Sequence, residues 1–148
     1  MKVTALIVLA CFALANADEW QPVNPERFPE IHNICNKKSP LTEENIEKIY
    51  VKFEFNNEPS VREYILCTVT EMKTFCEHDG FHAERVAQQF PNHKEEVAKH
   101  VTECNDKNEQ KSPLDEWCYR EHQCIFSGPV GNLMKEQILK TLKRPDIQ

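Results

Sequence analysis

Histidine and cysteine residues at helical spacing are the side chains of this sequence that could do chemistry. His78 and His82 are four residues apart, Cys118 and His122 repeat that spacing, and Cys76 lies close to the first pair. Residues four apart share one face of a helix, so these side chains could gather around a zinc ion. A glycine interrupts the first pair, however, and thiols of an exported protein more often form a disulfide. We therefore expect neither a metal ion nor a cofactor.

The stretch from Phe75 to Asp79 suggests a second chemistry, because it is similar to the Cys-x-x-His-Asp sequence of secreted phospholipases A2. In those enzymes a histidine activates water and an aspartate helps to hold calcium. Here His78 follows Cys76 by two positions rather than three, and a chain with three glycines has no glycine-rich calcium loop. Gly80 would also break the helix that presents the pair. The sequence therefore favours a protein that is not an enzyme.

The first residues have the pattern of a secretory signal peptide. Lys2 precedes an apolar run from Val3 to Leu14, and Ala15-Asn16-Ala17 matches a small-x-small cleavage site. The apolar run is shorter than the roughly 20 residues that a membrane-spanning helix needs. We expect residues 1–17 to be removed, and residues 18–148 to form one secreted, extracellular domain with no stable membrane insertion.

The cysteine count fits an oxidised extracellular domain. The chain has seven cysteines, and Cys11 belongs to the expected signal peptide. The others are Cys35, Cys67, Cys76, Cys104, Cys118 and Cys124. This even number suits three disulfides with no reactive thiol left over, although the count alone does not choose among the many possible pairings.

Apolar residues recur at helical spacing along most of the chain, whereas strand signals are scarce. The expected helices are Glu30 to Lys37, one capped by Thr42 and running to Phe53, one from a Ser60–Glu63 capping box to about Cys76, His82 to Phe90, one capped by Asn92 and running to Cys104, one capped by Ser112 and running to Ile125, and a last one through Leu133, Met134, Ile138 and Leu142. The pattern predicts an all-α fold of six to seven short helices.

Short helices, a signal peptide and paired cysteines are together similar to the insect odorant-binding proteins, in which disulfide-linked helices surround an internal apolar cavity. Four cysteines fit the first, third, fourth and sixth positions of that family: Cys35, Cys67, Cys104 and Cys124. Counting along the family's spacing puts Glu63 where the second cysteine would be and Asp115 where the fifth would be. The joint absence of these two cysteines resembles the subgroup called minus-C.

The resemblance implies the disulfides Cys35–Cys67 and Cys104–Cys124. Cys76 and Cys118 stand at new places and, as the remaining pair, are expected to form a third bridge. Cys76 lies 13 residues beyond Glu63, which is roughly 20 Å along an ideal helix, so this bridge cannot take the place of the missing one unless the third helix ends early. Two free thiols would instead favour the zinc or a redox alternative.

The function that the resemblance implies is the non-covalent capture of a small hydrophobic molecule, such as an odorant, a pheromone, a fatty acid or a terpenoid-like hormone. We expect the cavity to lie between the third, fourth, fifth and sixth helices, because their apolar faces should point toward a common centre. Its expected wall is Phe53, Tyr64, Met72, Phe75, Val86, Phe90, Val97, Val101 and Trp117. Any of these side chains could instead belong to a solid core. Tyr50, Tyr64 and Tyr119 are candidates to orient a carbonyl or hydroxyl group.

The expected partners are few. The formal net charge is −6 and basic residues are scattered among acidic ones, so nucleic acid is not an expected partner. The resemblance adds a membrane receptor downstream, and we expect a monomer or weak homodimer. Two alternatives stay open: a salivary or haemolymph protein of the same fold that sequesters a host mediator or inhibits a protein, and a secreted domain with a filled core.

Acid-triggered ligand release is a further hypothesis. Five of the six histidines lie on or near expected helix ends: His78, His82, His93, His100 and His122. Histidine gains its charge within the physiological pH range. Protonation near a helix start would oppose the helix dipole and near a helix end would favour it, so the direction of the effect does not follow from the sequence.

Overall fold

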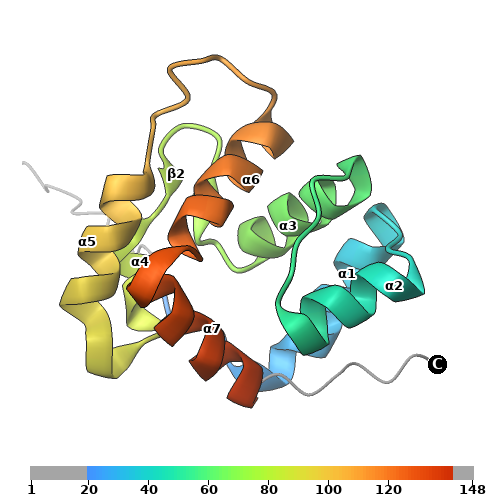
Figure 1. Cartoon of the computed structure of the whole chain (residues 1–148), viewed down its shortest axis with the longest axis horizontal. Helices are drawn as coiled ribbons and strands as arrows, with labels where there is room; N and C mark the ends of the chain where they lie inside the picture. Colours follow the sequence, from blue (N-terminus) through green and yellow to red (C-terminus); the bar gives the residue numbers. More distant parts are fainter. Residues whose placement is uncertain (1–19, 142–148) are drawn as a thin grey trace, which may run out of the picture.

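A computed structural model describes residues 20–141, and the expected signal peptide and Leu142 lie outside this range. The described residues form an all-α fold with one short hairpin (Figure 1). Its α-helices are α1 (Phe28–Lys38), α2 (Glu43–Glu47), α3 (Pro59–Glu71), α4 (Ala83–Gln88), α5 (Lys94–Cys104), α6 (Leu114–Ile125) and α7 (Gly128–Thr141). Shorter elements are η1 (Pro25–Arg27), η2 (Lys48–Lys52), η3 (Pro91–His93), β1 (Phe75–Cys76) and β2 (Gly80–Phe81).

The first two expected helices are present, although the second becomes a π-helical turn after Glu47. Thr42 caps α2, because its hydroxyl accepts a hydrogen bond from the backbone N–H of Asn45 at 3.1 Å. The chain continues directly into the π-helical turn η2 and leaves it at Phe53, which has a left-handed φ of 54°. This residue therefore turns the chain sharply, and its side chain is buried.

The third helix begins slightly earlier than expected, at Pro59, and ends earlier, at Glu71 rather than near Cys76. Proline occupies its first turn and Glu58 is its N-cap, so the predicted Ser60–Glu63 capping box does not form, and Glu63 accepts a hydrogen bond from Ser39 instead. At the other end Lys73 adopts a left-handed φ of 56°. The backbone N–H of Thr74 then donates a hydrogen bond to the carbonyl of Val69, which ends the helix. Cys76 consequently lies on a strand rather than on α3.

The hairpin β1–β2 was not anticipated from the sequence. Phe75 pairs with Phe81 and Cys76 pairs with Gly80 in antiparallel register. Strands of two residues are too short to show an alternating apolar pattern, which is the signal that predicts a strand. The hairpin connects the end of α3 to α4.

Two predicted N-caps are also displaced. Asn92 lies inside η3, and α5 begins at Lys94 without a side-chain cap. Pro113 rather than Ser112 is the N-cap of α6. Both helices begin within two residues of the expected place, so these differences do not alter which faces are buried.

The centre of the fold is α3, which packs against α1 on one side and α6 on the other, while α4 packs against α5 (Figure 1). The disulfide Cys35–Cys67 joins α1 to α3, and Cys104–Cys124 joins α5 to α6. Asp115, at the place of the missing fifth cysteine, accepts a hydrogen bond from Arg62 of α3 at 2.8 Å. An ion pair thus links α3 to α6 in the region where the absent bridge would lie.

The expected third disulfide is not formed, and Cys76 and Cys118 are both free. Because α3 ends early, Cys76 is carried onto the half-buried hairpin, where its sulfur contacts Asp79. Cys118 is fully buried on α6, and burial raises the pKa of its thiol. The two sulfurs therefore occupy separate environments.

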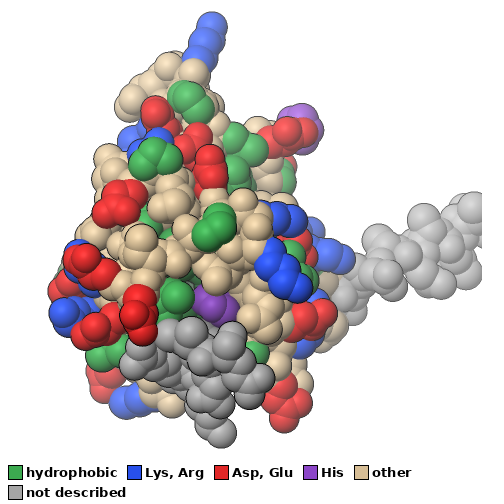
Figure 2. Space-filling view, turned by 90° about the vertical axis from the view of Figure 1, so that its right-hand side faces the viewer, with side chains coloured by type: hydrophobic (Ala, Val, Ile, Leu, Met, Phe, Trp, Pro, Cys, Tyr) green, Lys and Arg blue, Asp and Glu red, His purple; other side chains and the backbone are tan. Residues whose placement is uncertain are grey.

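The surface is mixed in charge. Figure 2 shows acidic and basic side chains interspersed over one face, without a patch of a single sign. Among residues 20–141, no helix has both the length and the apolar character needed to cross a membrane.

Candidate functional site: a central cavity

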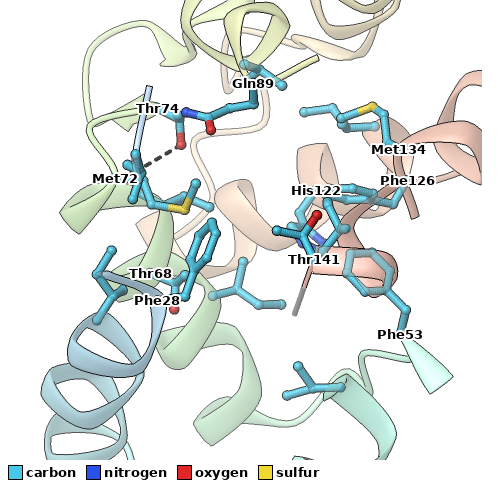
Figure 3. Close-up of a pocket in the computed structure, with 18 of the residues that line it drawn as sticks. Phe28, Phe53, Thr68, Met72, Thr74, Gln89, His122, Phe126, Met134 and Thr141 are labelled. Carbon is cyan, nitrogen blue, oxygen red and sulfur yellow. Dashed lines mark hydrogen bonds between the residues drawn. The ribbon is translucent and has the colours of Figure 1, made fainter. Parts of the chain in front are cut away.

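A cavity of about 290 Å³ lies at the centre of the fold. Side chains from the N-terminal segment and from helices at both ends of the chain surround it (Figure 3). The apolar part of the wall consists of Val23, Pro25, Phe28, Ile31, Ile49, Phe53, Phe55, Ile65, Val69, Met72, Phe81, Val86, Phe90, Ile125, Phe126, Met134 and Ile138. A wall of this composition can hold an apolar molecule through burial alone.

The structure brings together five of the nine residues that were expected in the wall. They are Phe53, Tyr64, Met72, Val86 and Phe90. The expected helices α3, α4 and α6 contribute to the cavity, and no α5 residue is among its lining residues.

The other four expected wall residues pack in the core instead. Phe75 and Trp117 form an aromatic cluster with Phe81. The ring centroid of Phe75 lies 5.4 Å from that of Trp117 and 5.1 Å from that of Phe81. Val97 and Val101 are completely buried on α5, which contacts α4, α6 and α7. An apolar stripe shows that a helix face is buried, but a neighbouring helix can cover it as well as a cavity.

Sequence reasoning missed the contributions of α1 and α7. Phe28 and Ile31 of α1 and Met134 and Ile138 of α7 line the cavity. The apolar stripe of α7 was visible in the sequence, but periodicity alone does not show whether such a stripe faces a cavity or a neighbouring helix. His122 was missed as well, although a histidine between the buried positions of α6 was an available signal.

A polar cluster of three neutral side chains occupies one part of the wall. The hydroxyl oxygens of Tyr50 and Tyr64 each lie 2.9 Å from Nδ1 of His32, and the two hydroxyls are hydrogen-bonded to each other. Burial raises the pKa of both phenols and lowers the pKa of His32. Tyr119, the third tyrosine proposed for ligand orientation, lies outside the wall and donates to the carbonyl of Phe55 at 3.0 Å.

His122 of α6 is the second polar feature of the wall. Its ring lies between Phe55 and Phe126, with centroid distances of 4.5 Å and 4.6 Å, and Figure 3 shows it beside Phe126 at the cavity. The side chain is 5% exposed, and its Nδ1 has no hydrogen-bond partner among the described residues. Burial lowers the pKa of this imidazole to about 3, so it is neutral at physiological pH.

Further neutral polar groups complete the wall. The hydroxyls of Thr68 and Thr74 donate to backbone carbonyls at 2.8 Å and 3.1 Å and are therefore already partnered. The side-chain nitrogen of Gln89 is buried, and none of the described residues is its hydrogen-bond partner. No Asp, Glu, Lys or Arg occurs among the lining residues that the structure describes. The cavity thus offers hydrogen bonds but no formal charge.

The residues considered for zinc binding are not all brought together. Cys118 is buried in the core, His122 lines the cavity, and His78 is exposed with its ring 3.5 Å from a carboxylate oxygen of Glu77. Cys76 alone approaches His82, and the two meet the carboxylate of Asp79.

Comparison with known proteins agrees with this architecture. The sequence profile described as the PBP/GOBP family matches residues 17–128. General odorant-binding protein 99a of Drosophila melanogaster is 31% identical over 139 residues, which is 91% of this chain and 96% of the relative. An odorant-binding protein of Locusta migratoria, known from its crystal structure, matches with a TM-score of 0.61 and 16% identity over 83% of this chain and 93% of the locust chain.

The match to the locust structure shows that the fold is the same. The family profile and the fruit-fly relative show which protein family the chain comes from. The fold predicted from helical spacing and the family predicted from the cysteine pattern are both confirmed. The chain belongs to the PBP/GOBP family of insect odorant-binding proteins.

Proposed function

We propose that residues 18–148 form a secreted carrier, and that its central cavity holds one small apolar molecule with a single uncharged hydrogen-bonding group. The observation that carries this proposal is the cavity wall, which is mostly apolar, has no charged side chain among its described residues and includes His122, whose buried Nδ1 has no hydrogen-bond partner among those residues. A buried polar atom without a hydrogen bond costs about 1–3 kcal/mol. A ligand hydroxyl or carbonyl would remove that cost, because a neutral imidazole can donate or accept according to its tautomer.

The size of the cavity indicates a small ligand. Its volume of about 290 Å³ is at the lower end of the range of about 300–1,000 Å³ for small-molecule sites. Burial gains about 0.8 kcal/mol for each methylene. A chain of roughly ten methylenes therefore gains about 8 kcal/mol, which corresponds to a dissociation constant near the micromolar range.

The neutral wall also predicts which polar group the ligand carries. A carboxylate would leave water without meeting a cation among the described lining residues, and an unpaired buried charge is strongly disfavoured. A hydroxyl would gain about 0.5–1.5 kcal/mol from its hydrogen bond. Alcohols, ketones and aldehydes are therefore better candidates than the fatty acids that the family resemblance alone allowed.

Displacement of the fluorescent probe N-phenyl-1-naphthylamine tests the proposal. We expect saturable probe uptake, and we expect 1-decanol to displace the probe at least tenfold more effectively than decanoate at pH 7. The variant His122→Phe keeps the aromatic packing and should weaken decanol binding about threefold to tenfold. The control His78→Phe removes an exposed imidazole from the hairpin and should change neither affinity.

Absence of saturable probe uptake would contradict the carrier function itself. Equal binding of decanol and decanoate would contradict only the assignment of an uncharged ligand. Export is tested separately by N-terminal sequencing of protein secreted from insect cells, which should begin at Asp18.

A further inference from the structure

The hairpin β1–β2 gathers three different metal-ligating side chains outside the cavity wall. Cys76 lies on β1, Asp79 lies in the turn, and His82 directly follows β2. The thiol sulfur, a carboxylate oxygen and a ring nitrogen of these residues all lie within 4.8 Å of one another. Neither disulfide includes Cys76, and none of the three residues lines the cavity. The carrier function therefore does not account for this cluster.

The backbone holds the three side chains in place before any ion binds. Gly80 has a positive φ of 73°, and a β-carbon there would lie 2.7 Å from a carboxylate oxygen of Glu121. Glycine is thus the residue that fits this turn, and the turn brings Asp79 back over Cys76. The backbone N–H of His82 donates to the carbonyl of Thr74 at 2.8 Å, which closes the hairpin.

The other side of the turn is also tied down. The side-chain amide of Asn105 donates to the backbone carbonyl of Asp79 at 2.6 Å. The backbone N–H of Asp79 donates to the sulfur of Cys76 at 3.4 Å. The thiol sulfur also contacts a carboxylate oxygen of Asp79 at 3.7 Å, so these two side chains already lie together.

The set of donor atoms points to a particular class of ion. Cys76 and Asp79 are separated by two residues, a spacing typical of paired ligands in zinc sites. Sulfur, imidazole nitrogen and carboxylate oxygen together suit Zn²⁺, whereas Ca²⁺ and Mg²⁺ take oxygen ligands. Asp79 is exposed and the other two are half-buried, so an ion has a path of entry.

We propose that Cys76, Asp79 and His82 form a binding site for a divalent transition-metal ion of the zinc class, with water completing the coordination. The ion bridges the two ends of the hairpin. Because it binds the folded chain through ligands from three positions, it stabilises the protein by an amount that grows with its concentration. Cys76 is then held as a coordinated thiolate rather than left as an oxidisable free thiol.

Titration of the purified, metal-free protein with Co²⁺ and Zn²⁺ tests the site. We expect a single Co²⁺ per chain, with the sulfur-to-cobalt charge-transfer absorption that thiolate ligation produces, and we expect Zn²⁺ to displace it. Cys76→Ser should abolish that absorption. His82→Gln and Asp79→Asn should each weaken binding at least tenfold. The control His78→Gln removes an imidazole from the same turn that lies outside the cluster and should leave binding unchanged.

Thiol chemistry supplies a second measurement that does not depend on absorption. Cys118 is fully buried, so a thiol reagent should modify Cys76 alone in the native protein. Zn²⁺ should slow that reaction, and a chelator should restore it. If Cys76→Ser fails to fold by circular dichroism, the His82→Gln and Asp79→Asn variants carry the test. The proposal is overturned by the absence of a charge-transfer band, by equal losses in His78→Gln and His82→Gln, or by isolation of a Cys76–Cys118 disulfide.

Discussion

Two neighbouring residues of α6, Glu121 and His122, are both buried and polar, yet their surroundings are opposite. Glu121 is 1% exposed, and its carboxylate accepts hydrogen bonds from the indole of Trp117 at 2.8 Å and from the backbone N–H groups of Phe81 and Asp106 at 3.2 Å each. His122 is 5% exposed and lines the cavity, and its buried Nδ1 has no hydrogen-bond partner among the described residues. The carboxylate of Glu121 therefore has its hydrogen bonds satisfied within the protein, whereas Nδ1 of His122 has none among the described residues.

The two residues also respond oppositely to pH. Burial raises the pKa of Glu121, and the hydrogen bonds from Phe81 and Trp117 oppose that shift. Burial lowers the pKa of His122 to about 3. The folded state thus favours the neutral form of each side chain, so acid stabilises the fold at Glu121 and destabilises it at His122.

The largest expected effect is the loss of stability on replacing Glu121, whose carboxylate has its hydrogen bonds satisfied. Glu121→Ala leaves two buried N–H donors and one partly buried donor without an acceptor, and each buried unsatisfied donor costs about 1–3 kcal/mol. We expect the free energy of unfolding to fall by about 3 kcal/mol or more, measured by urea denaturation. The control Glu116→Ala alters an exposed carboxylate on the same helix and should change it by less than about 0.5 kcal/mol. Equal effects would show that Glu121 does not hold the hairpin and loop to α6.

The effect of burying His122 should appear in the pH dependence of the free energy of unfolding, rather than in a loss of contacts. The unfolded imidazole binds a proton near pH 6.5, whereas the folded one does so near pH 3. The stability that depends on neutral His122 is therefore complete above pH 6.5 and is lost as the pH falls toward 3, at up to about 1.4 kcal/mol per pH unit. In His122→Phe this loss should disappear.

Urea titrations of both proteins between pH 7 and pH 4 measure this difference. Near pH 7 the variant should be at least as stable as the original protein, because Nδ1 has no partner to lose among the described residues and the cost of burying it is removed. A difference between the two proteins that stays constant across this range would contradict the burial of a neutral imidazole.

Sequence patterns predicted the helices of the molecule better than the residues that line its cavity. Helical periodicity identified each α-helix because an apolar stripe is a local property of a few turns. It could not show that the stripes of α4 and α5 face different neighbours: Val86 lies at the cavity, whereas Val97 lies in the core. The early end of α3 depends on the left-handed conformation of Lys73, a residue type that gives no such signal. The environment of His122 depends on ring contacts with Phe55, which is far away in the sequence, and with Phe126, which follows the end of α6. The pattern of α6 alone could not show these contacts.

A smaller effect is expected where α3 and α6 are joined by charge. Arg62 and Asp115 are 17% and 23% exposed in their side chains, whereas Lys99 and Glu103 of α5 are 79% and 62% exposed. A double-mutant cycle with alanine at Arg62 and Asp115 should give a coupling free energy of about 0.5–1 kcal/mol, and a cycle at the exposed pair should give less than about 0.5 kcal/mol. Equal coupling in the two cycles would mean that the ion pair does not compensate for the missing disulfide.

The smallest expected effect is that of acid on ligand binding. The lining residues described contain no carboxylate and no ammonium or guanidinium group, and the pKa values of His32 and His122 are both lowered by burial. With a pKa of about 3, only about one per cent of His122 is protonated at pH 5. The affinity for 1-decanol should therefore change by less than about twofold between pH 7 and pH 5, in contrast to the hypothesis of acid-triggered release. Probe displacement at pH 7, 6 and 5, with circular dichroism to verify folding at each pH, makes the comparison. A tenfold loss at pH 5 in the original protein that is absent from His122→Phe would show that this imidazole is charged in the cavity, and that its two ring nitrogens meet partners other than the ligand.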